Sequence, residues 1–392
     1  MEAPTSSIEQ LMRQKDEIIK QKDEIIKKME EIIKQKDEII KEKNDFISDL
    51  KEIISKIYKK EINKNNEKEK NKEKNDINTA ELDDNKIFKD FNIVNLTPKY
   101  KLSNHGEKSI YTILQLQDGR LASGGADGII NIYNKETLKP ELTISEHHSN
   151  GVWHLIQLKD GNLVSCSKDD KTMNLYQLIG KNKYKLLSQK NVGQDKEPRK
   201  LRELENGEIG LVAFDYIIFY LNINNSFDED FRIKYDENQI KQYYNMITVK
   251  PGELVISGGA DKIQFFDLNS RKLKEIININ RDIRWFPEEL LCMINERCLC
   301  VGGKNKITLV DVYQKNIIIE VEDIGIHNCL LKLNDNFLLT GTEHDITQWK
   351  ISQNNISLIS KKEKAHQSRI RNIIKFNNFI VSASDDHSIK VW

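Results

Sequence analysis

The sequence predicts an all-β propeller of seven blades that is preceded by a long α-helical coiled coil. Three observations support this fold class. Near the N-terminus, a seven-residue unit with two adjacent isoleucines recurs, as in KDEIIKQKDEIIKKMEEIIKQKDEII from residue 15. From about residue 88 onward, short β-rich runs and turn signals recur at a spacing of roughly 40 residues, which is typical of propeller blades. Between these two parts lies a stretch with almost no apolar residues.

Residues 8–58 form the predicted coiled coil. The isoleucine pairs fill heptad positions d and e, and neither Pro nor Gly interrupts the chain from Ile8 to Ile57. A strict seven-residue repeat implies a left-handed supercoil, and the helix would be roughly 75 Å long. This apolar stripe is shielded from water only if it packs against a partner helix. The residues expected to carry oligomerisation are Ile18, Ile19, Ile25, Ile26, Ile32, Ile33, Ile39 and Ile40.

Two arrangements of the coil stay open. Isoleucine at d and e makes a wide apolar stripe that suits more than one neighbour, whereas lysine at four of the eight a positions discourages tight trimers or tetramers. One resolution is a self-associated dimer, parallel or antiparallel, whose e column meets a second protein. The other is a heteromeric coil, in which a different chain presents acidic residues to the lysines.

Residues 59–86 read as a charged flexible linker. The segment mixes Lys, Glu, Asp and Asn and contains almost nothing apolar. It therefore cannot bury enough surface to offset the entropy of an ordered chain.

Composition excludes several classes of protein. The 392 residues hold 61 Lys+Arg and 61 Asp+Glu, so no chain-wide positive charge favours a nucleic acid as a partner. No run reaches the ~20 apolar residues of a membrane span, and the N-terminus lacks the pattern of a signal peptide. The five scattered cysteines indicate buried thiols in a reducing compartment rather than a disulfide framework. We therefore expect a cytoplasmic protein.

Residues 87–392 contain seven copies of a repeat, of which the last, AHQSRIRNIIKFNNFIVSASDDHSIKVW, is the clearest. It closely resembles a WD40 repeat. This resemblance implies a four-stranded blade that is locked by a buried His–Ser/Thr–Asp–Trp hydrogen-bond chain. The matching residues here are His366, Ser382, Asp386 and Trp392. They are expected to be structural rather than catalytic.

The other copies match this pattern to different degrees. Copies 1 and 2 match well, copy 4 keeps a serine and an aspartate, copy 6 keeps Thr340 and Trp349, and copies 3 and 5 are eroded. The matching residues are His105, Ser123, Asp127 and Tyr133 in copy 1, His148, Ser165, Asp170 and Tyr176 in copy 2, and Ser257 and Asp261 in copy 4. In copy 4 the nearest match to the tryptophan is Phe266, which comes one residue early.

The ends of the propeller are expected to meet. Copy 7 reaches only its third strand, while the segment before copy 1 contains the apolar-rich FNIVNL and KYKL. If that segment supplies the missing outer strand, the ring closes and no sheet edge stays exposed.

Nothing in the sequence indicates an enzyme. It contains no G-x-S-x-G, P-loop, H-E-x-x-H or paired C-x-x-C motif, so we expect no catalytic residues, no metal site and no cofactor.

The start of each inner strand is the expected binding position. In the family that the repeats resemble, the residue after the first apolar residue of that strand points to the top rim of the central channel. Trp, Tyr and Arg are the residue types most enriched at binding hot spots, and this set is expected to anchor a peptide with acidic or aromatic side chains. Carried over, the position gives Tyr111, Trp153, Arg199, Tyr244, Arg284 (with Glu289 as the alternative in copy 5), Asn328 and Arg371.

These features together predict a non-enzymatic scaffold for protein–protein interaction. The coil would join copies of the chain, and each propeller would recruit a partner protein or peptide through its top face. The alternatives are a substrate receptor of a ubiquitin ligase and a cytoskeletal or ciliary structural component.

Overall fold

The computed structural model describes residue 88 and residues 91–392, apart from 194–196, 214–215, 224, 235–242, 259–261, 280–289 and 353–354. The chain divides into the units Met1–Ala80 and Glu81–Trp392. The predicted linker and the isoleucine columns lie outside the described residues. Within the predicted coil, five described positions are helical and exposed, namely Lys20, Lys22, Glu24, Lys27 and Glu31.

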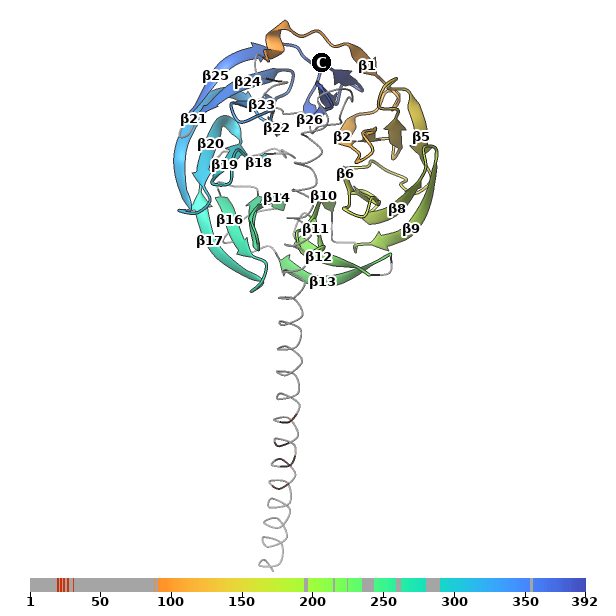
Figure 1. The fold of residues 1–392 in the computed structure, drawn as a ribbon, viewed down its shortest axis with the longest axis vertical. Helices are drawn as coiled ribbons and strands as arrows, with labels where there is room; N and C mark the ends of the chain where they lie inside the picture. Colours follow the sequence, from red (N-terminus) through yellow and green to blue (C-terminus); the bar gives the residue numbers. More distant parts are fainter. Residues whose placement is uncertain are drawn as a thin grey trace, which may run out of the picture. The chain divides into compact units, whose positions relative to one another are not determined.

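The second unit contains seven four-stranded antiparallel sheets that follow one another around a ring (Figure 1). Blades 1 to 3 consist of β2 (Ile110–Gln115), β3 (Leu121–Gly125), β4 (Ile130–Tyr133) and β5 (Pro140–Ile144); β6 (His154–Gln157), β7 (Leu163–Ser167), β8 (Thr172–Ile179) and β9 (Lys183–Asn191); and β10 (Pro198–Glu203), β11 (Ile209–Ala213), β12 (Tyr216–Ile223) and β13 (Ser226–Lys234). Blades 4 to 6 consist of β14 (Tyr243–Lys250), β15 (Glu253–Gly258), β16 (Lys262–Asp267) and β17 (Lys272–Asn278); β18 (Leu291–Met293), β19 (Cys298–Gly302), β20 (Lys304–Asp311) and β21 (Asn316–Ile326); and β22 (Cys329–Lys332), β23 (Phe337–Gly341), β24 (Ile346–Ser352) and β25 (Asn355–Lys362). The seven-bladed propeller that the sequence predicts is confirmed.

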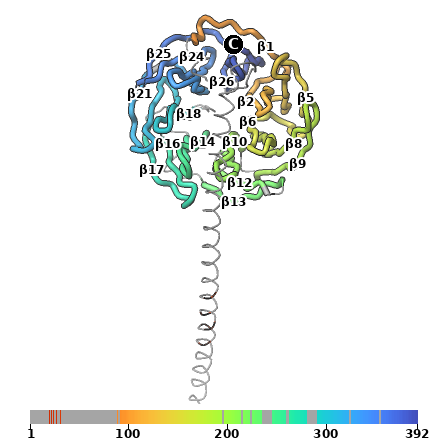
Figure 2. The backbone as a smooth tube through the Cα atoms, in the orientation of Figure 1, coloured from red at the N-terminus to blue at the C-terminus, as the bar shows by residue number. Residues whose placement is uncertain are grey.

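Blade 7 joins the two ends of the ring. Its order is β1-β28-β27-β26, built from β26 (Ile370–Phe376), β27 (Phe379–Ser384), β28 (Ile389–Val391) and, from before the first blade, β1 (Tyr100–Leu102). Figure 2 shows β1 near the C-terminal end of the chain, at the place where the ring closes. The backbone of β1 pairs Tyr100 with Val391 and Leu102 with Ile389. The expected closure is therefore confirmed, and the KYKL segment supplies the strand.

The FNIVNL segment has a different role. It forms a 3-10 turn, η1 (Ile93–Asn95), that packs on blade 6 instead of joining a sheet. Ile93 is fully buried, its backbone N–H donates to Gln348 Oε1 at 3.1 Å, and Gln348 Nε2 donates to the carbonyl oxygen of Phe91 at 2.7 Å. We call residue 88 and residues 91–96 the strap. It ties the entry of the chain to blade 6 just before β1 closes blade 7.

The hydrophobic core is divided into layers between neighbouring blades. One layer joins Ile130 and Ile132 of blade 1 to Leu155, Leu163 and Tyr176 of blade 2. The inner strands are covered on both faces, so that all five residues of β3 are buried. Each fully buried aliphatic side chain contributes about 1.5–3 kcal/mol to folding, and the layers together hold the blades in place.

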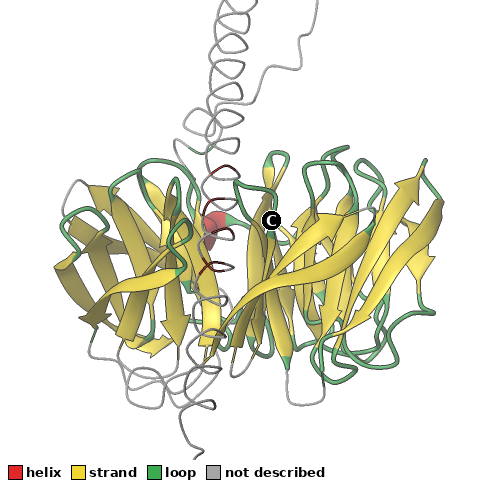
Figure 3. Cartoon of the chain, turned by 90° about the horizontal axis from the view of Figure 1, so that it is seen from below, coloured by secondary structure: helices red, strands yellow, loops and turns green. Residues whose placement is uncertain are grey.

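Loops gather at two opposite rims of the ring (Figure 3). Because the strands are antiparallel, the start of the first strand in each blade lies beside the turn between its second and third strands, as the pairing of Ile110 with Gly125 shows. We call this the upper rim. The turns between first and second strands form the lower rim.

All five cysteines are described and carry free thiols, and four of them are buried. The expectation of buried thiols is therefore confirmed for Cys166, Cys298, Cys300 and Cys329.

Candidate functional site

The polar chain that the sequence predicts inside the blades is complete in blades 1 and 7. In blade 7, His366 Nδ1 lies 2.9 Å from Asp386 Oδ2, His366 Nε2 lies 2.7 Å from Ser382 Oγ, and Trp392 Nε1 donates to the same Oγ at 2.8 Å. A carboxylate only accepts, so Nδ1 donates to Asp386 and Nε2 accepts from the serine hydroxyl. These four buried side chains thereby supply one another with hydrogen-bond partners.

Blades 1 and 2 repeat this arrangement with tyrosine in place of tryptophan. In blade 1, His105 bonds Asp127 at 2.9 Å and Ser123 at 2.7 Å, and the Tyr133 hydroxyl lies 3.2 Å from Ser123 Oγ. In blade 2, His148 Nε2 lies 2.6 Å from Ser165 Oγ, while its Nδ1 lies 3.3 Å from Asp170 Oδ2. Burial raises the pKa of Tyr133 to about 12, so its hydroxyl keeps its proton.

Burial also keeps His148 and His366 neutral. It lowers the pKa of His148 to about 4, and it lowers the pKa of His366. For Asp170, burial raises the pKa, but hydrogen bonds from Ser149 and Asn150 outweigh it and bring the pKa to about 2. Each of these neutral histidines is buried and held between a hydroxyl and a carboxylate, so its role here is structural.

A further polar side chain, which was not singled out from the sequence, lies beside the histidine in blades 1 and 2. Asn131 Nδ2 lies 3.3 Å from His105 Nε2, and Asn174 Nδ2 lies 3.1 Å from His148 Nε2 and donates to the carbonyl oxygen of His147. In blade 7, Lys390 donates from the same strand position to the carbonyl oxygen of Ala365 at 2.6 Å. The signal is a polar residue two positions before the terminal aromatic residue.

The sequence-based alignment of blade 4 needs a correction. Phe266 pairs with Leu254 as Tyr133 pairs with Leu121, so Phe266 occupies the regular aromatic position. The same register places Ile256, which is buried, at the serine position, while Ser257 lies one residue later. Blade 4 therefore lacks the serine link. Asp261 lies outside the described residues. Blade 6 keeps part of the polar chain, because Trp349 Nε1 donates to Thr340 Oγ1 at 3.1 Å.

The predicted binding residues share one backbone feature at the upper rim. In blades 1, 3, 4 and 7, the pairing of the first two strands skips one residue, so that Tyr111, Arg199, Tyr244 and Arg371 are each a single bulge residue in the ladder. Trp153 holds the equivalent place in blade 2, where its N–H donates to the carbonyl oxygen of Cys166, the residue that pairs with His154. Bulges redirect side chains out of the sheet, and here the same device recurs around the rim.

Four of these residues lie along one continuous series of contacts across blades 7, 1, 2 and 3. The guanidinium of Arg371 lies 5.1 Å from the ring centroid of Tyr111, and the ring of Tyr111 stacks on that of Trp153 at 4.7 Å and 28°. The ammonium of Lys168 lies 5.3 Å from the ring centroid of Trp153 and 3.5 Å from Glu197 Oε2. Arg199 Nη2 donates to the same Glu197 oxygen at 2.8 Å. We call these residues, with Asp169 and Asp385, the rim patch.

The cations of the rim patch are paired within the patch. Arg371 Nε donates to Asp385 Oδ1 at 2.8 Å, as Arg199 does to Glu197. Lys168 was not singled out from the sequence, because it lies in the turn between β7 and β8 and not at a strand start. Only the pairing of strands brings that turn beside Trp153.

The remaining predicted positions differ in what the structure describes. Asn328 lies directly before β22 but is buried, with 4% of its surface exposed. The backbone of Tyr244 lies in β14, and its side chain is not described. Arg284 and Glu289 lie outside the described residues.

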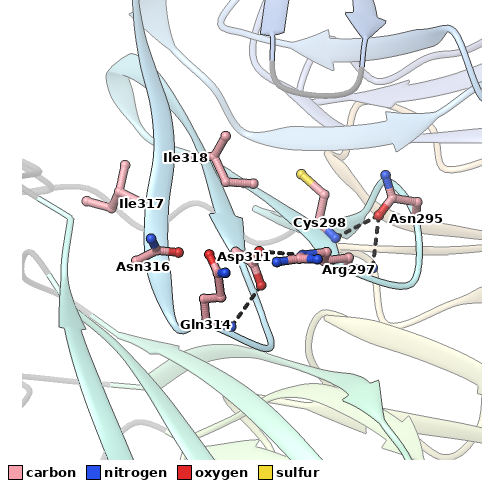
Figure 4. Close-up of a pocket in the computed structure, with 8 residues that line it drawn as sticks. All are labelled: Asn295, Arg297, Cys298, Asp311, Gln314, Asn316, Ile317 and Ile318. Atoms are coloured by element: carbon pink, nitrogen blue, oxygen red, sulfur yellow. Dashed lines mark hydrogen bonds and ion pairs between the residues drawn. The ribbon is translucent and has the colours of Figure 1, made fainter.

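A concave region lies at the lower rim of blade 5 (Figure 4). This pocket of about 640 Å³ is lined mainly by the turns around Asn295 and Gln314. Its polar groups serve the turns themselves: Arg297 pairs with Asp311 at 2.5 Å, and Asp311 Oδ1 accepts from the N–H of Gln314. The described part of the chain contains no group of three or more His, Cys, Asp or Glu side chains placed to hold a metal ion.

Comparison with known proteins agrees with this geometry. Residues 96–134, 138–177 and 357–392 match the family model described as "WD domain, G-beta repeat". These segments hold the polar chains of blades 1, 2 and 7, where histidine, serine and aspartate are all present. No curated protein matches the chain. Among the described residues, no helix has the length and apolar character needed to cross a membrane. The chain thus contains WD40 repeats, and they form part of a seven-bladed β-propeller.

Proposed function

We propose that the protein is an interaction scaffold that binds a segment of a partner protein at the rim patch and joins copies of itself through residues 8–58. A propeller with WD40 repeats is in general a platform for protein interaction. The finer assignment to the upper rim is supported by one observation above all, the bulged Tyr111 and the neighbouring Trp153, which are half-buried and stacked across two blades.

Physical chemistry explains why this observation points to binding. At the upper rim, four blades each have one bulge residue that is left out of the pairing between the first two strands. Bulges of this kind gain nothing for the ladder of hydrogen bonds. The residues at these bulges include aromatic and arginine residues, whose side chains dominate the energetics of protein interfaces.

Oligomerisation through the coil would add avidity. Each propeller presents one modest site, and a linker such as residues 59–86 lets neighbouring sites reach targets on the same partner. Weak single-site binding then becomes strong binding to a multivalent partner.

Selection of random peptides displayed on phage against the full-length chain tests the proposal. Peptides recovered on the wild type should lose about 30-fold in affinity for Trp153→Ala, the effect of removing a hot-spot aromatic residue. Tyr313→Ala is the matched control, because Tyr313 is an exposed aromatic residue on the lower rim. Both variants should remain folded, and Trp153→Ala should unfold at a slightly lower temperature than the wild type, because it loses the stack on Tyr111, worth about 0.5–1.5 kcal/mol, but no contact in the core layers. Peptides that bind Trp153→Ala unchanged, or that depend on Tyr313, would overturn the proposal.

A further inference from the structure

Resting on the proposed function, we infer that the rim patch recognises a lysine or arginine side chain of its partner, in the place that the ammonium of Lys168 holds in this structure. Residue types alone favoured an acidic or aromatic partner side chain. The geometry of the patch argues for the opposite charge.

The place beside Trp153 has the chemistry of a cation site. The ammonium of Lys168 lies over the indole ring at 5.3 Å and within 3.5 Å of a carboxylate oxygen of Glu197. A second carboxylate, that of Asp169, lies 3.5 Å from the indole Nε1. An aromatic face beside carboxylates is the arrangement that attracts ammonium and guanidinium groups.

The exposed charges of the patch are mainly negative. The side chains of Arg199 and Arg371 are only 8% and 13% exposed, whereas those of their carboxylate partners, Glu197 and Asp385, are 38% and 18% exposed. Asp169 is exposed as well. An approaching peptide therefore meets carboxylates before it meets the guanidinium groups, which favours a basic segment and disfavours an acidic one.

Lys168 is a weak occupant of this place. Its ion pair with Glu197 is long, and its side chain is 25% exposed, so the pair adds little to stability. Tyr111 covers one side of Trp153, and Arg371 in turn covers Tyr111. A partner can therefore approach Trp153 from the side where Lys168, in the β7–β8 turn of blade 2, reaches toward Glu197 of blade 3. A partner cation there would replace both contacts of Lys168, the one with the indole ring and the one with Glu197. A partner phenyl ring would replace only the contact with the indole ring and would leave Glu197 without its lysine.

The test uses the full-length chain and four immobilised pools of random octapeptides whose central residue is fixed as Lys, Arg, Glu or Phe. Retention of the chain on each pool is measured for the wild type, Lys168→Met, Glu197→Gln and Trp153→Ala. The matched controls are Lys159→Met and Glu205→Gln, exposed residues in lower-rim turns of the same two blades.

The Lys and Arg pools should retain the wild type more strongly than the Glu pool. Lys168→Met, which removes the competing ammonium, should raise that retention by about fivefold, and Glu197→Gln should lower it by about fivefold. The control variants should match the wild type. Preference for the Glu or Phe pool, with dependence on Trp153, would overturn the choice of a cation and leave the binding site in place. Retention on no pool by any variant would overturn both the site and its specificity.

Discussion

The ring of Tyr111 stacks on the ring of Trp153 at a centroid distance of 4.7 Å, although one side chain comes from blade 1 and the other from blade 2. The contact spans the junction between two sheets at the rim, above the core layer that holds them together. Stacked aromatic pairs contribute about 0.5–1.5 kcal/mol beyond the area they bury. The pair therefore presents a rigid aromatic surface whose formation depends on correct docking of the blades.

Ser382, the serine of the polar chain in blade 7, should contribute more to the free energy of unfolding than its small size suggests. Ser382→Ala leaves Trp392 Nε1 and His366 Nε2 buried without their partner, which costs about 2–3 kcal/mol. Urea unfolding should show this loss in the free energy of unfolding. Ser357→Ala, at an exposed position of β25, should change it by less than about 0.5 kcal/mol. Equal effects of the two changes would contradict a stabilising role for the polar chain.

Stability should fall on acidification because burial lowers the pKa of His148 and of His366. The pKa of His148 is about 4 in the folded protein, below its ordinary value of 6.5. As the pH falls from 6.5 toward 4, His148 binds a proton in the unfolded chain but stays neutral in the folded chain. The contribution is thus fully present above about pH 6.5 and decreases by roughly 3 kcal/mol toward pH 4. His366 adds a loss of the same sign, and Asp170 adds one only below its ordinary pKa of 3.8.

Urea unfolding from about pH 7 to about pH 4.5 checks this window. The variant His148→Gln, although less stable at neutral pH, should have a shallower pH dependence than the wild type. An identical slope in both proteins would show that the proton uptake arises elsewhere.

The strap should contribute to the stability of the ring. Ile93 is fully buried against blade 6, whereas its neighbour Val94 is 42% exposed. Ile93→Ala should therefore cost about 2–4 kcal/mol of unfolding free energy, and Val94→Ala less than about 0.5 kcal/mol. Chemical denaturation of the two variants measures the difference. If both unfold like the wild type, the strap is not part of the cooperative unit.

The isoleucine columns should control the state of association. We expect the full-length chain to sediment as an oligomer, and the double change Ile25→Asn with Ile32→Asn to shift it toward the monomer, because both residues occupy the apolar seam. The control carries Lys20→Asn and Lys27→Asn, two exposed positions with a similar loss of helix propensity. If the wild type sediments as a monomer, self-association through residues 8–58 and the avidity proposed from it are both wrong.

The regular parts of the fold follow from the sequence where side-chain chemistry enforces spacing. A buried histidine needs a hydroxyl and a carboxylate, so His105, His148 and His366 each indicate the position of a turn from the sequence alone. Blade 4 shows the limit of this reasoning. Its SGGAD segment copies that of blade 1, yet the burial of Leu254 and Phe266 sets a register in which Ser257 lies one residue beyond the usual place. A slip of one residue would turn every side chain of the strand to the opposite face, so the apolar pairs prevail over the motif.

The candidate site was predicted only in part for a related reason. Strand starts can be counted along a sequence, and four of the residues selected in this way, Tyr111, Trp153, Arg199 and Arg371, lie along the series of contacts at the upper rim. Burial at those positions depends on neighbouring blades, and so the covered Asn328 could not be told from its more exposed counterparts. Lys168, Glu197 and Asp385 enter the rim patch through long-range pairing, which no local pattern records.

The closure of blade 7 has a consequence for synthesis of the protein on the ribosome. Strand β1 emerges before any blade, but its partner β28 is the last strand of the ring to be made. Until then, a nascent chain carries a β1 without its partner strand and a growing series of blades with one open edge. Contacts between residues so distant in sequence form slowly, and open edges invite aggregation in the meantime. The strap binds blade 6, so it can hold β1 near its final place one blade before the ring is complete.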